Sequence, residues 1–367
     1  SGAMDPLALA IANRLAGNEA GAAGIEFTLG GFELRFGADT VFALAGADCA
    51  ATLDGWALPP MWCMTARAGQ VLRGGAPRTG MRSYLAVAGG FDLAPVLGSA
   101  STDLKGGFGG WEGRALQQGD RLPLRARGQA APACDWGLAP ECLTELCGPA
   151  DAPIRLVAAA EHDLFDEAAR QALVEAEWTV QPDSNRVGYR LTGPGLTPTR
   201  RIEMLSHGIL PGTIQVPPSG QPVIQLSDAN TCGGYPKIAA VIGADLWRLG
   251  QARLGGALQA RDDHAVGRRQ ARLDHPQPLD NRSQLHRLRR HRAVLGDDID
   301  GAAGLVGRDG RVRHQQGVIG LGARDLGAAE HARTQEAVGV GNDGAQTDHA
   351  RGRVDRIIRE VQATGAV

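Results

Sequence analysis

Short runs of alternating apolar and polar residues fill the chain from 24 to 124 and restrict its fold more than any other feature. Each run is bounded by Gly, Asp or Pro, as in IEFTL, FELRF, TVFALAG, SYLAVAGG and DRLPL. Alternation with a period of two is typical of strands that bury one face. The 52 glycines and 20 prolines among 367 residues also indicate many turns. We therefore expect a β-rich unit of the sandwich or barrel type.

The segment 206–250 predicts a strand, a turn, a second strand, a glycine loop and a helix. Ile214 and Val216 belong to the first strand and Val223–Leu226 to the second, with a turn rich in Pro, Ser and Gly between them. Pro236 would be the first residue of the helix, because the apolar residues after it recur at helical spacing. A hairpin followed by a helix is expected.

The loop in front of this expected helix contains Gly233 and Gly234, between Thr231 and Tyr235. Two glycines let the backbone approach a ligand, and unpaired N–H groups at a helix start favour a carboxylate, a phosphate or a polarised carbonyl oxygen. The loop matches neither the Walker pattern nor the dinucleotide fingerprint. Taken alone it therefore favours the alternative, a tight turn that binds nothing.

A polar, glycine-rich loop at residues 98–114 interrupts the alternating runs. Ser99, Ser101, Thr102 and Asp103 lie at its start, and several glycines follow them. Loops on rigid β scaffolds often carry binding residues. These four residues are therefore candidate ligand contacts, with a solvated crossover between strands as the alternative.

Two arginines and a serine surround one glycine in the segment 184–193. Arg186 and Arg190 flank Gly188, and Ser184 precedes them. Guanidinium forks suit carboxylate or phosphate oxygens. An anion site is one interpretation, and ion pairing at the surface is the other.

Two further helices are expected. Asp5 is a good N-cap, Pro6 a good first residue and Gly17 a good stop for the first helix. Asp163 is expected to cap a second helix that runs to about Glu175.

The charge and the cysteines argue against several classes of protein. A formal charge of −2 argues against a nucleic-acid binder or a binder of acidic membranes. No apolar run reaches the length of a membrane span, and no signal peptide is recognisable. The six cysteines form no CxxC pair and no metal-finger spacing, which fits a reducing compartment and predicts no metal site. A cytoplasmic protein is expected.

Four motifs follow one another over about residues 1–253: SGAMDPLALAIANRLAGN, GSASTDLKGGFGGWEGRALQQGDRL, SNRVGYRLTGPGL and EMLSHGILPGTIQVPPSGQPVIQLSDANTCGGYPKIAAVIGADL. Together they resemble the biotin-dependent carboxyltransferase family. That family includes the C subunit of the ATP-dependent 5-oxoprolinase, proteins labelled allophanate hydrolase subunit 2, and the carboxyltransferase domain of urea carboxylase. Because no biotin-carboxylase or biotin-carrier segment is fused to this chain, it most resembles the 5-oxoprolinase members.

The resemblance implies a mainly β fold with some helix (α+β), built as two cyclophilin-like β-barrel units with a cleft between them. The first unit would occupy residues 1–125 and the second 151–254, joined by a linker or crossover at 126–150. The implied reaction opens the lactam of 5-oxoproline to L-glutamate, with ATP and Mg bound by a heteromer that includes the B subunit of 5-oxoprolinase together with the 5-oxoproline-cleaving A subunit. One alternative is a biotin-dependent carboxyltransferase of the urea carboxylase or allophanate hydrolase type. Another is a non-catalytic regulatory partner of a kinase inhibitor that resembles the B subunit.

The resemblance also implies roles for the candidate residues. An unstrained lactam resists water, so Arg186, Arg190 and the glycine N–H groups of the 231–235 loop are expected to face the negative charge that develops on its carbonyl oxygen. Glu203 and His207 are candidate proton carriers, although a histidine in a Ser-His-Gly turn is more often structural. Residues expected to bind the substrate or the nucleotide are Ser99, Ser101, Thr102, Asp103, Ser184, Thr231, Gly233, Gly234 and Tyr235.

Both ends of the chain depart from the family pattern. An N-terminal stretch with an Asp-Leu-Gly-Arg segment and a first barrel strand is missing, which would leave an unpaired sheet edge. Residues 255–367 contain no Phe, Trp, Tyr, Cys, Met or Lys and are rich in Arg, Asp and His. This composition predicts an atypical tail, either disordered or translated out of frame. Its removal is expected to leave the melting temperature nearly unchanged.

Overall fold

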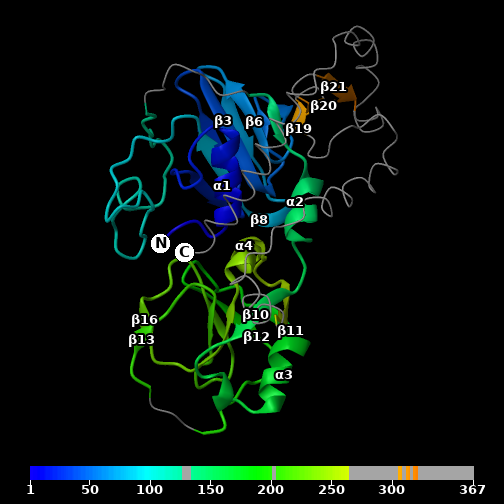
Figure 1. Ribbon diagram of the computed structural model, residues 1–367. Helices are drawn as coiled ribbons and strands as arrows, with labels where there is room; N and C mark the ends of the chain where they lie inside the picture. Colours follow the sequence, from blue (N-terminus) through cyan, green and yellow to red (C-terminus); the bar gives the residue numbers. More distant parts are fainter. Residues whose placement is uncertain (126–133, 201–203, 264–304, 308–310, 315–316, 321–367) are drawn as a thin grey trace, which may run out of the picture.

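The computed structural model describes residues 1–125, 134–200 and 204–263, together with 305–307, 311–314 and 317–320. Figure 1 shows two bodies, a sheet-rich one in blue and cyan and a barrel in green below it. Strands outnumber helices in both bodies, which confirms the mainly β prediction.

Two sheets form the first body around a shared core. Their strands are β1 (Ile25–Thr28), β2 (Phe32–Arg35), β3 (Thr40–Asp48), β4 (Thr52–Leu53), β5 (Trp56–Ala57), β6 (Trp62–Ala66), β7 (Val71–Gly74), β8 (Thr79–Val87), β9 (Trp136–Leu138), β19 (Leu305–Gly307), β20 (Arg311–His314) and β21 (Gly317–Gly320). The larger sheet has the order β1-β8-β3-β6-β9-β19-β20-β21, and the smaller one β2-β7-β4-β5. Phe42, Trp62 and Leu72 are buried between them. This core fixes the positions of β1 and β2 as sheet edges.

Helix α1 (Pro6–Leu15) begins where the sequence predicts it. The Asp5 carboxylate accepts a hydrogen bond from Ala8 N at 2.8 Å. The helix ends before Gly17, whose φ of 80° is a conformation that glycine adopts without strain. Ile11 and Leu15 pack on β3 and β8, so the helix covers the outer face of the larger sheet.

A closed barrel forms the second body. Its strands are β10 (Ile154–Ala158), β11 (Glu177–Val180), β12 (Gly188–Thr192), β14 (Thr213–Gln215), β15 (Val223–Gln225), β17 (Lys237–Val241) and β18 (Ala257–Asp262), in the closed order β10-β17-β14-β15-β12-β11-β18. Trp178 and Tyr189 fill its interior. Ile214 lies opposite Ile224 in an antiparallel pair, which confirms the predicted hairpin.

The remaining elements are short. They are helices α2 (Pro140–Cys147), α3 (Glu167–Glu175) and α4 (Leu246–Gln251), the 3₁₀ turns η1 (His162–Leu164) and η2 (Gly243–Asp245), and the two-stranded pair β13 (His207–Gly208) and β16 (Cys232–Gly233). Over the described residues, none of the helices combines the length and apolar character needed to cross a membrane.

The prediction of a helix from Pro236 is wrong. Residues 237–241 form strand β17, which pairs with β10 and β14 inside the barrel. Most of this strand is buried on both faces. A short apolar run of that kind has no period that separates strand from helix, so the barrel context decides.

The start of the second predicted helix also differs. Asp163 lies in the turn η1, and α3 begins after Asp166, whose carboxylate accepts a hydrogen bond from Ala169 N at 2.8 Å. The predicted end at Glu175 is confirmed. Both aspartates are competent caps, and only the path of the chain through η1 selects the later one.

The structure places β18 within the barrel, although composition predicts that the atypical tail begins at 255. This strand pairs in parallel with β10 and antiparallel with β11. Leu258 and Ala260 point into the core. The segment 126–150, expected as a linker, contains β9 and α2. The sequence predicts none of these three elements, because strands of three to six residues and a helix of eight residues give little periodic signal.

The two bodies meet along a buried polar seam. Arg82 from β8 donates hydrogen bonds to the Tyr189 hydroxyl at 2.9 Å and to Gly250 O at 2.6 Å. Gln251 Nε2 donates to Asp5 Oδ2 at 2.7 Å. The N-terminal segment is therefore held between the bodies, beside the cleft described next.

Candidate functional site

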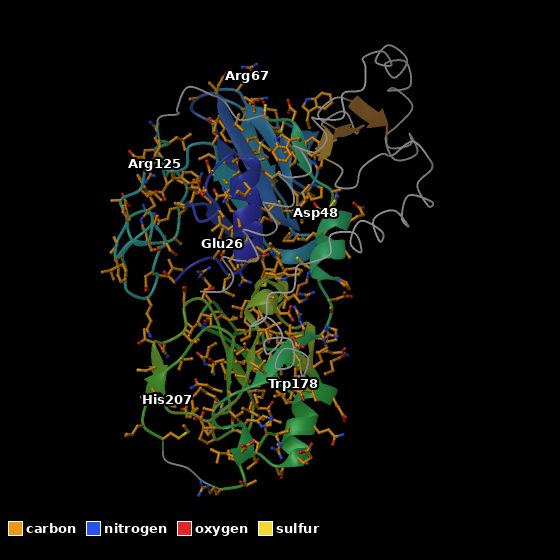
Figure 2. The ribbon with its side chains drawn as sticks, in the orientation of Figure 1. Glu26, Asp48, Arg67, Arg125, Trp178 and His207 are labelled. Carbon is orange, nitrogen blue, oxygen red and sulfur yellow. The ribbon has the colours of Figure 1, made fainter. Side chains whose placement is uncertain are left out.

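An open cleft of about 2810 Å³ extends over the first body and reaches the second. Most of the segment 24–38 lines it, together with part of the loop 99–124. Near the second body its lining includes Arg186 and Asp245. Figure 2 shows Glu26 near the junction of the two bodies and His207 at the outer edge of the barrel body. The cleft therefore lies near Glu26 and not near His207.

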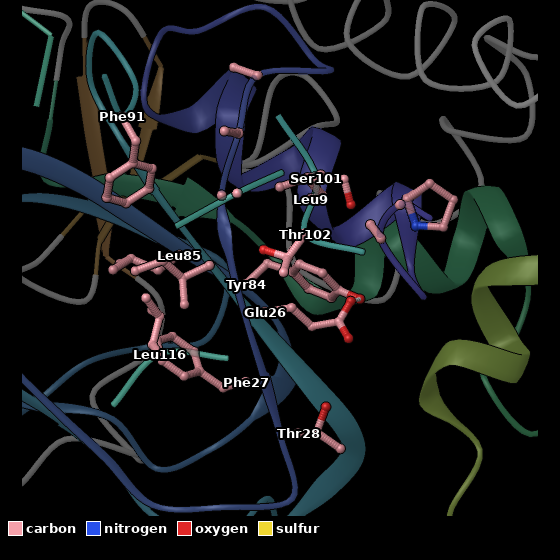
Figure 3. A pocket seen from close by; sticks show the side chains of 18 of the residues that line it. Leu9, Glu26, Phe27, Thr28, Tyr84, Leu85, Phe91, Ser101, Thr102 and Leu116 are labelled. Atoms are coloured by element: carbon pink, nitrogen blue, oxygen red, sulfur yellow. Dashed lines mark hydrogen bonds between the residues drawn. The ribbon is translucent and has the colours of Figure 1, made fainter. Parts of the chain in front are cut away.

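One region of the cleft is polar and an adjoining one is apolar (Figure 3). We call the first the polar corner; it consists of Glu26, Tyr84, Ser101 and Thr102. The apolar part consists of Phe27, Leu85, Phe91 and Leu116. A pocket of this kind can hold a ligand that is partly hydrocarbon and partly hydrogen-bonding.

Glu26 on β1 is at the centre of the polar corner. Its Oε2 accepts hydrogen bonds from the Tyr84 hydroxyl at 2.8 Å and from Met4 N at 2.9 Å. Its Oε1 accepts from Arg186 and lies 3.6 Å from Arg82 Nε. Burial, followed by the nearby negative charges, raises the pKa of Tyr84 well above its usual value. Tyr84 therefore stays a neutral donor toward the Glu26 carboxylate.

The Arg186 guanidinium is almost fully occupied by protein acceptors. Its Nε lies 2.8 Å from Asp228 Oδ2, and its other nitrogens donate to Glu26 and to the carbonyl of Gly2. Burial works against the charge of Arg186, yet the hydrogen bonds to Asp228 and Glu26 raise its pKa above the ordinary value. Arg186 thus ties the N-terminal segment to the second body, and its expected role toward a substrate stays a prediction.

Asp5 contributes a buried carboxyl group to the same seam. Burial raises its pKa to about 6, while the hydrogen bonds from Gln251 and Ala8 act in the opposite direction. The negative charge of Glu26 raises it further. The seam is therefore sensitive to protonation in the mildly acidic range.

Four of the predicted site residues line the cleft: Ser99, Ser101, Thr102 and Arg186. Ser101 accepts a hydrogen bond from the Ser1 hydroxyl at 3.3 Å. Asp103 is not part of the lining, because its carboxylate accepts from the backbone N–H of Gly106 at 2.7 Å and closes its own turn. The loop thus places the hydroxyls of Ser99, Ser101 and Thr102 at the cleft, whereas the Asp103 carboxylate stabilises the turn of the loop itself.

Ser184 and Arg190 lie outside the cleft lining. The Ser184 hydroxyl accepts a hydrogen bond from Arg190 N at 3.0 Å, within the turn that precedes β12. The exposed Arg190 side chain lies 3.4 Å from Asp183. These contacts match the surface ion pairing that the sequence left open as an alternative.

The remaining predicted residues gather on a second segment, which we call the finger: residues 204–210 and 230–235, including β13 and β16. It carries His207, Thr231, Gly233, Gly234 and Tyr235, and none of these lines the cleft. The carbonyl of Leu205 lies 3.0 Å from His207 Nδ1. Glu203 lies outside the described residues.

The expected convergence of Arg186 with the glycine N–H groups is therefore not what the structure shows. Arg186 lines the cleft, whereas Gly233 lies on the finger in register with His207. A Cβ on Gly233 would meet Ile209 Cδ1 at 2.6 Å, so packed side chains occupy its flank. Because Pro236 precedes a strand, no helix start presents unpaired N–H groups there.

With this geometry in hand, the chain can be compared with known proteins. The sequence profile of the carboxyltransferase domain, subdomains A and B, matches residues 1–261. The chain belongs to this family. The match extends through β18, in agreement with its place in the barrel.

Two relatives show how this carboxyltransferase domain is used. It is 46% identical over 260 residues to the C subunit of 5-oxoprolinase from Escherichia coli, covering 69% of this chain and 79% of the relative. It is 36% identical over 277 residues to a putative urea carboxylase of Emericella nidulans, covering 71% of this chain and 22% of that protein. The same domain thus occurs both within a much longer chain and in a protein named as a subunit.

Two solved structures share the fold. The crystal structure of TTHA0988 superposes with a TM-score of 0.62 at 38% identity, covering 71% of this chain and 50% of the other. The urea carboxylase of Kluyveromyces lactis superposes with a TM-score of 0.65 at 30% identity, covering 73% of this chain and 25% of the other. The carboxyltransferase domain therefore spans about half of the first solved chain and a quarter of the second.

Sequence reasoning missed Glu26 and Tyr84 as lining residues of this carboxyltransferase domain. Both lie in alternating runs, IEFTL and SYLAVAGG, that predict strands. A carboxylate or phenol in such a run normally faces solvent on the polar side of a strand. Only the pairing of β1 with β8, which sets Glu26 opposite Tyr84, brings them together.

Proposed function

We propose that this carboxyltransferase domain is the subunit of an ATP-dependent 5-oxoprolinase that holds 5-oxoproline while its lactam is opened to L-glutamate. The observation that carries the proposal is the polar corner beside the apolar part of one cleft, in a chain similar to the C subunit of a 5-oxoprolinase. As one component of a hydrolase system, the chain would act only with its partners. Its six cysteines are thiols, which supports a reducing compartment such as the cytoplasm.

The chemistry of the cleft suits a small lactam. The methylene carbons of the ring would lie against Phe27 and Leu85. The hydroxyls of Ser101 and Thr102 would donate to the amide oxygen, on which negative charge grows as the carbonyl is attacked. The Glu26 carboxylate accepts from Tyr84, Met4 and Arg186, and a remaining lone pair on Oε1 would accept the ring N–H. Its orientation is already fixed by Tyr84, so it needs little rearrangement to bind.

ATP with Mg²⁺ does not fit the described residues of this chain. Within those ranges, no three His, Cys, Asp or Glu side chains come together as a metal site. Each acid that lines the cleft is already in an ion pair: Glu26 with Arg186, Glu33 with Arg73, Asp120 with Arg114 and Asp245 with Arg155. We therefore assign the nucleotide to the other chains of the assembly, the B subunit together with the 5-oxoproline-cleaving A subunit.

Reconstitution tests this proposal. Purified full-length chain is mixed with the A and B subunits of 5-oxoprolinase, ATP, Mg²⁺ and 5-oxoproline, and L-glutamate is measured with time. Release that requires both ATP and this chain is the expected result. The matched control replaces this chain with the C subunit of the Escherichia coli 5-oxoprolinase. Release with the control and none with this chain would reject the assignment.

Similarity to urea carboxylases supports a second candidate function, transfer of a carboxyl group from carboxybiotin to a small amide. The polar corner would polarise the amide carbonyl in that reaction as well. Urea-dependent loss of carboxybiotin in the presence of this chain, without glutamate release in the first assay, would favour it. Binding to the B subunit with neither activity would instead indicate a regulatory protein.

A further inference from the structure

Large exposed apolar side chains gather on the loop 97–108 and on the finger, two segments that touch through a hydrogen bond, and we call them together the apolar rim. Two of them are almost fully exposed, Leu97 at 94% and Leu205 at 90% of their maximal area. The rim consists of Leu97, Leu104, Phe108, Leu205, Leu210 and Tyr235. Isolated exposed leucines are ordinary, but six large apolar side chains on two neighbouring segments mark an interaction site.

A hydrogen bond joins the two halves of the rim. Lys105 Nζ, next to Leu104, donates to Asn230 Oδ1 at 2.8 Å. Asn230 belongs to the finger and precedes β16. In Figure 1 the cyan loop and the strands β13 and β16 lie on the same side of the molecule. Residues from both bodies therefore contribute to one surface.

The rim borders the cleft without forming its interior. Leu104 lines the cleft, and so do Ser101 and Thr102 earlier in the same loop. Leu97 and Leu205 are not among the lining residues. A small molecule in the cleft would leave most of the rim in water, whereas a surface that covers the rim would also lie beside the polar corner.

The comparisons point to a folded protein as the occupant. The matched domain makes up 50% of the TTHA0988 chain and 22% of the putative urea carboxylase, so in both proteins it is joined to further polypeptide. The relative from Escherichia coli is named a subunit. A domain used as a separate subunit would need an apolar surface to bind, as a second chain, the polypeptide that is covalently joined to it in those proteins.

We propose that the apolar rim is the docking face for a folded partner subunit whose contact surface is itself apolar. This inference deepens the proposed function and rests on it. The partner is expected to present aromatic, Met and Leu side chains to the rim, with an acceptor opposite Lys105, whose hydrogen bond to Asn230 goes to a neutral amide. Docking at the rim places the partner next to the cleft, where an assembly must bring nucleotide and lactam together.

The test measures binding of full-length chain to the B subunit, the partner in the proposed assembly, by calorimetry. Leu97→Ser and Leu205→Ser are each expected to weaken binding at least tenfold. The matched control is Trp56→Ser, which removes another large exposed apolar side chain, 74% exposed, from β5 in the first body. It should leave affinity within about twofold, since it lies off the interface. Unchanged melting curves show that the variants are folded.

A second measurement needs no substitution. Cys232 on β16 is exposed, whereas Cys49 and Cys63 are buried. The B subunit should slow the reaction of Cys232 with a thiol reagent at least tenfold. Normal binding by both rim variants, or an unprotected Cys232 in the complex, overturns the proposal. Self-association of the chain that Leu205→Ser abolishes also overturns it, because a second copy would then be the occupant. If wild type binds as expected but releases no glutamate, the proposed function fails and the docking face stands.

Discussion

Ending the chain at Leu254 should destabilise the barrel severely, because β18 is its closing strand. Leu258 is 7% exposed in the core, and its burial contributes about 2 kcal/mol. Flanking backbone hydrogen bonds join Gly255 N to Val180 O at 2.7 Å, Val180 N to Gly256 O at 3.0 Å and Asp263 N to Leu156 O at 2.9 Å. At about 1 kcal/mol each they contribute about 3 kcal/mol, for a total of about 5 kcal/mol.

That loss is comparable with the whole stability of a typical domain, about 5–15 kcal/mol. A fall in melting temperature of about 20–40 °C is expected, because a body close to 100 residues long loses about 4–8 °C for each kcal/mol. Circular dichroism or calorimetry would measure it, with a chain ending at Asp263 as the matched control that keeps β18. Equal melting temperatures for the two truncations would refute the closing role of β18 and restore the boundary expected from composition.

Three further outcomes are expected. Arg186→Ala should cost about 3 kcal/mol in urea denaturation, because it removes the cation beside the largely buried Asp228 carboxylate, whereas exposed Arg190→Ala should cost under about 1 kcal/mol; equal costs would contradict the anchoring role. Glu26→Gln should reduce glutamate release at least tenfold in the reconstituted assay, while Glu167→Gln, which breaks an exposed pair with Arg170 outside the cleft lining, should not; unchanged release would remove Glu26 from the site. Burial raises the pKa of Asp5 from 3.8 to about 6, so protonation of Asp5 stabilises the folded state. This contribution to the free energy of unfolding, about 3 kcal/mol, is fully present below pH 3.8 and should be lost as the pH rises through 6. Urea denaturation across that pH range should show no such fall in stability for Asp5→Asn. The same fall in the wild type and in this variant would exclude Asp5 as the source of the pH dependence.

Local sequence signals were sufficient to predict several elements of the fold. The Asp5-Pro6 cap predicts α1, and the turn between Ile214 and Val223 predicts the β14–β15 hairpin. Both depend on chemistry within a few residues of the element. The cleft hydroxyls Ser101 and Thr102 were also among the candidates, because polar loops on β scaffolds commonly reach a site.

Where the outcome depends on distant partners, one prediction is wrong and another stays a prediction. The run after Pro236 fits a helix or a strand, and the neighbours β10 and β14 select the strand. Arg186 has the chemistry of an anion binder, but Asp228 and Glu26 reach it from elsewhere in the chain and occupy its donors.

By itself the sequence determined the β-rich class, the family and the polar character of the 98–114 loop, because these follow from periodicity, composition and ordered motifs. Only the tertiary structure decided which polar groups share a cleft. Strand pairing sets Glu26 beside Tyr84 in the cleft and Gly233 beside His207 on the finger. Spacing along the chain cannot encode such proximities, since they arise from register between strands tens of residues apart.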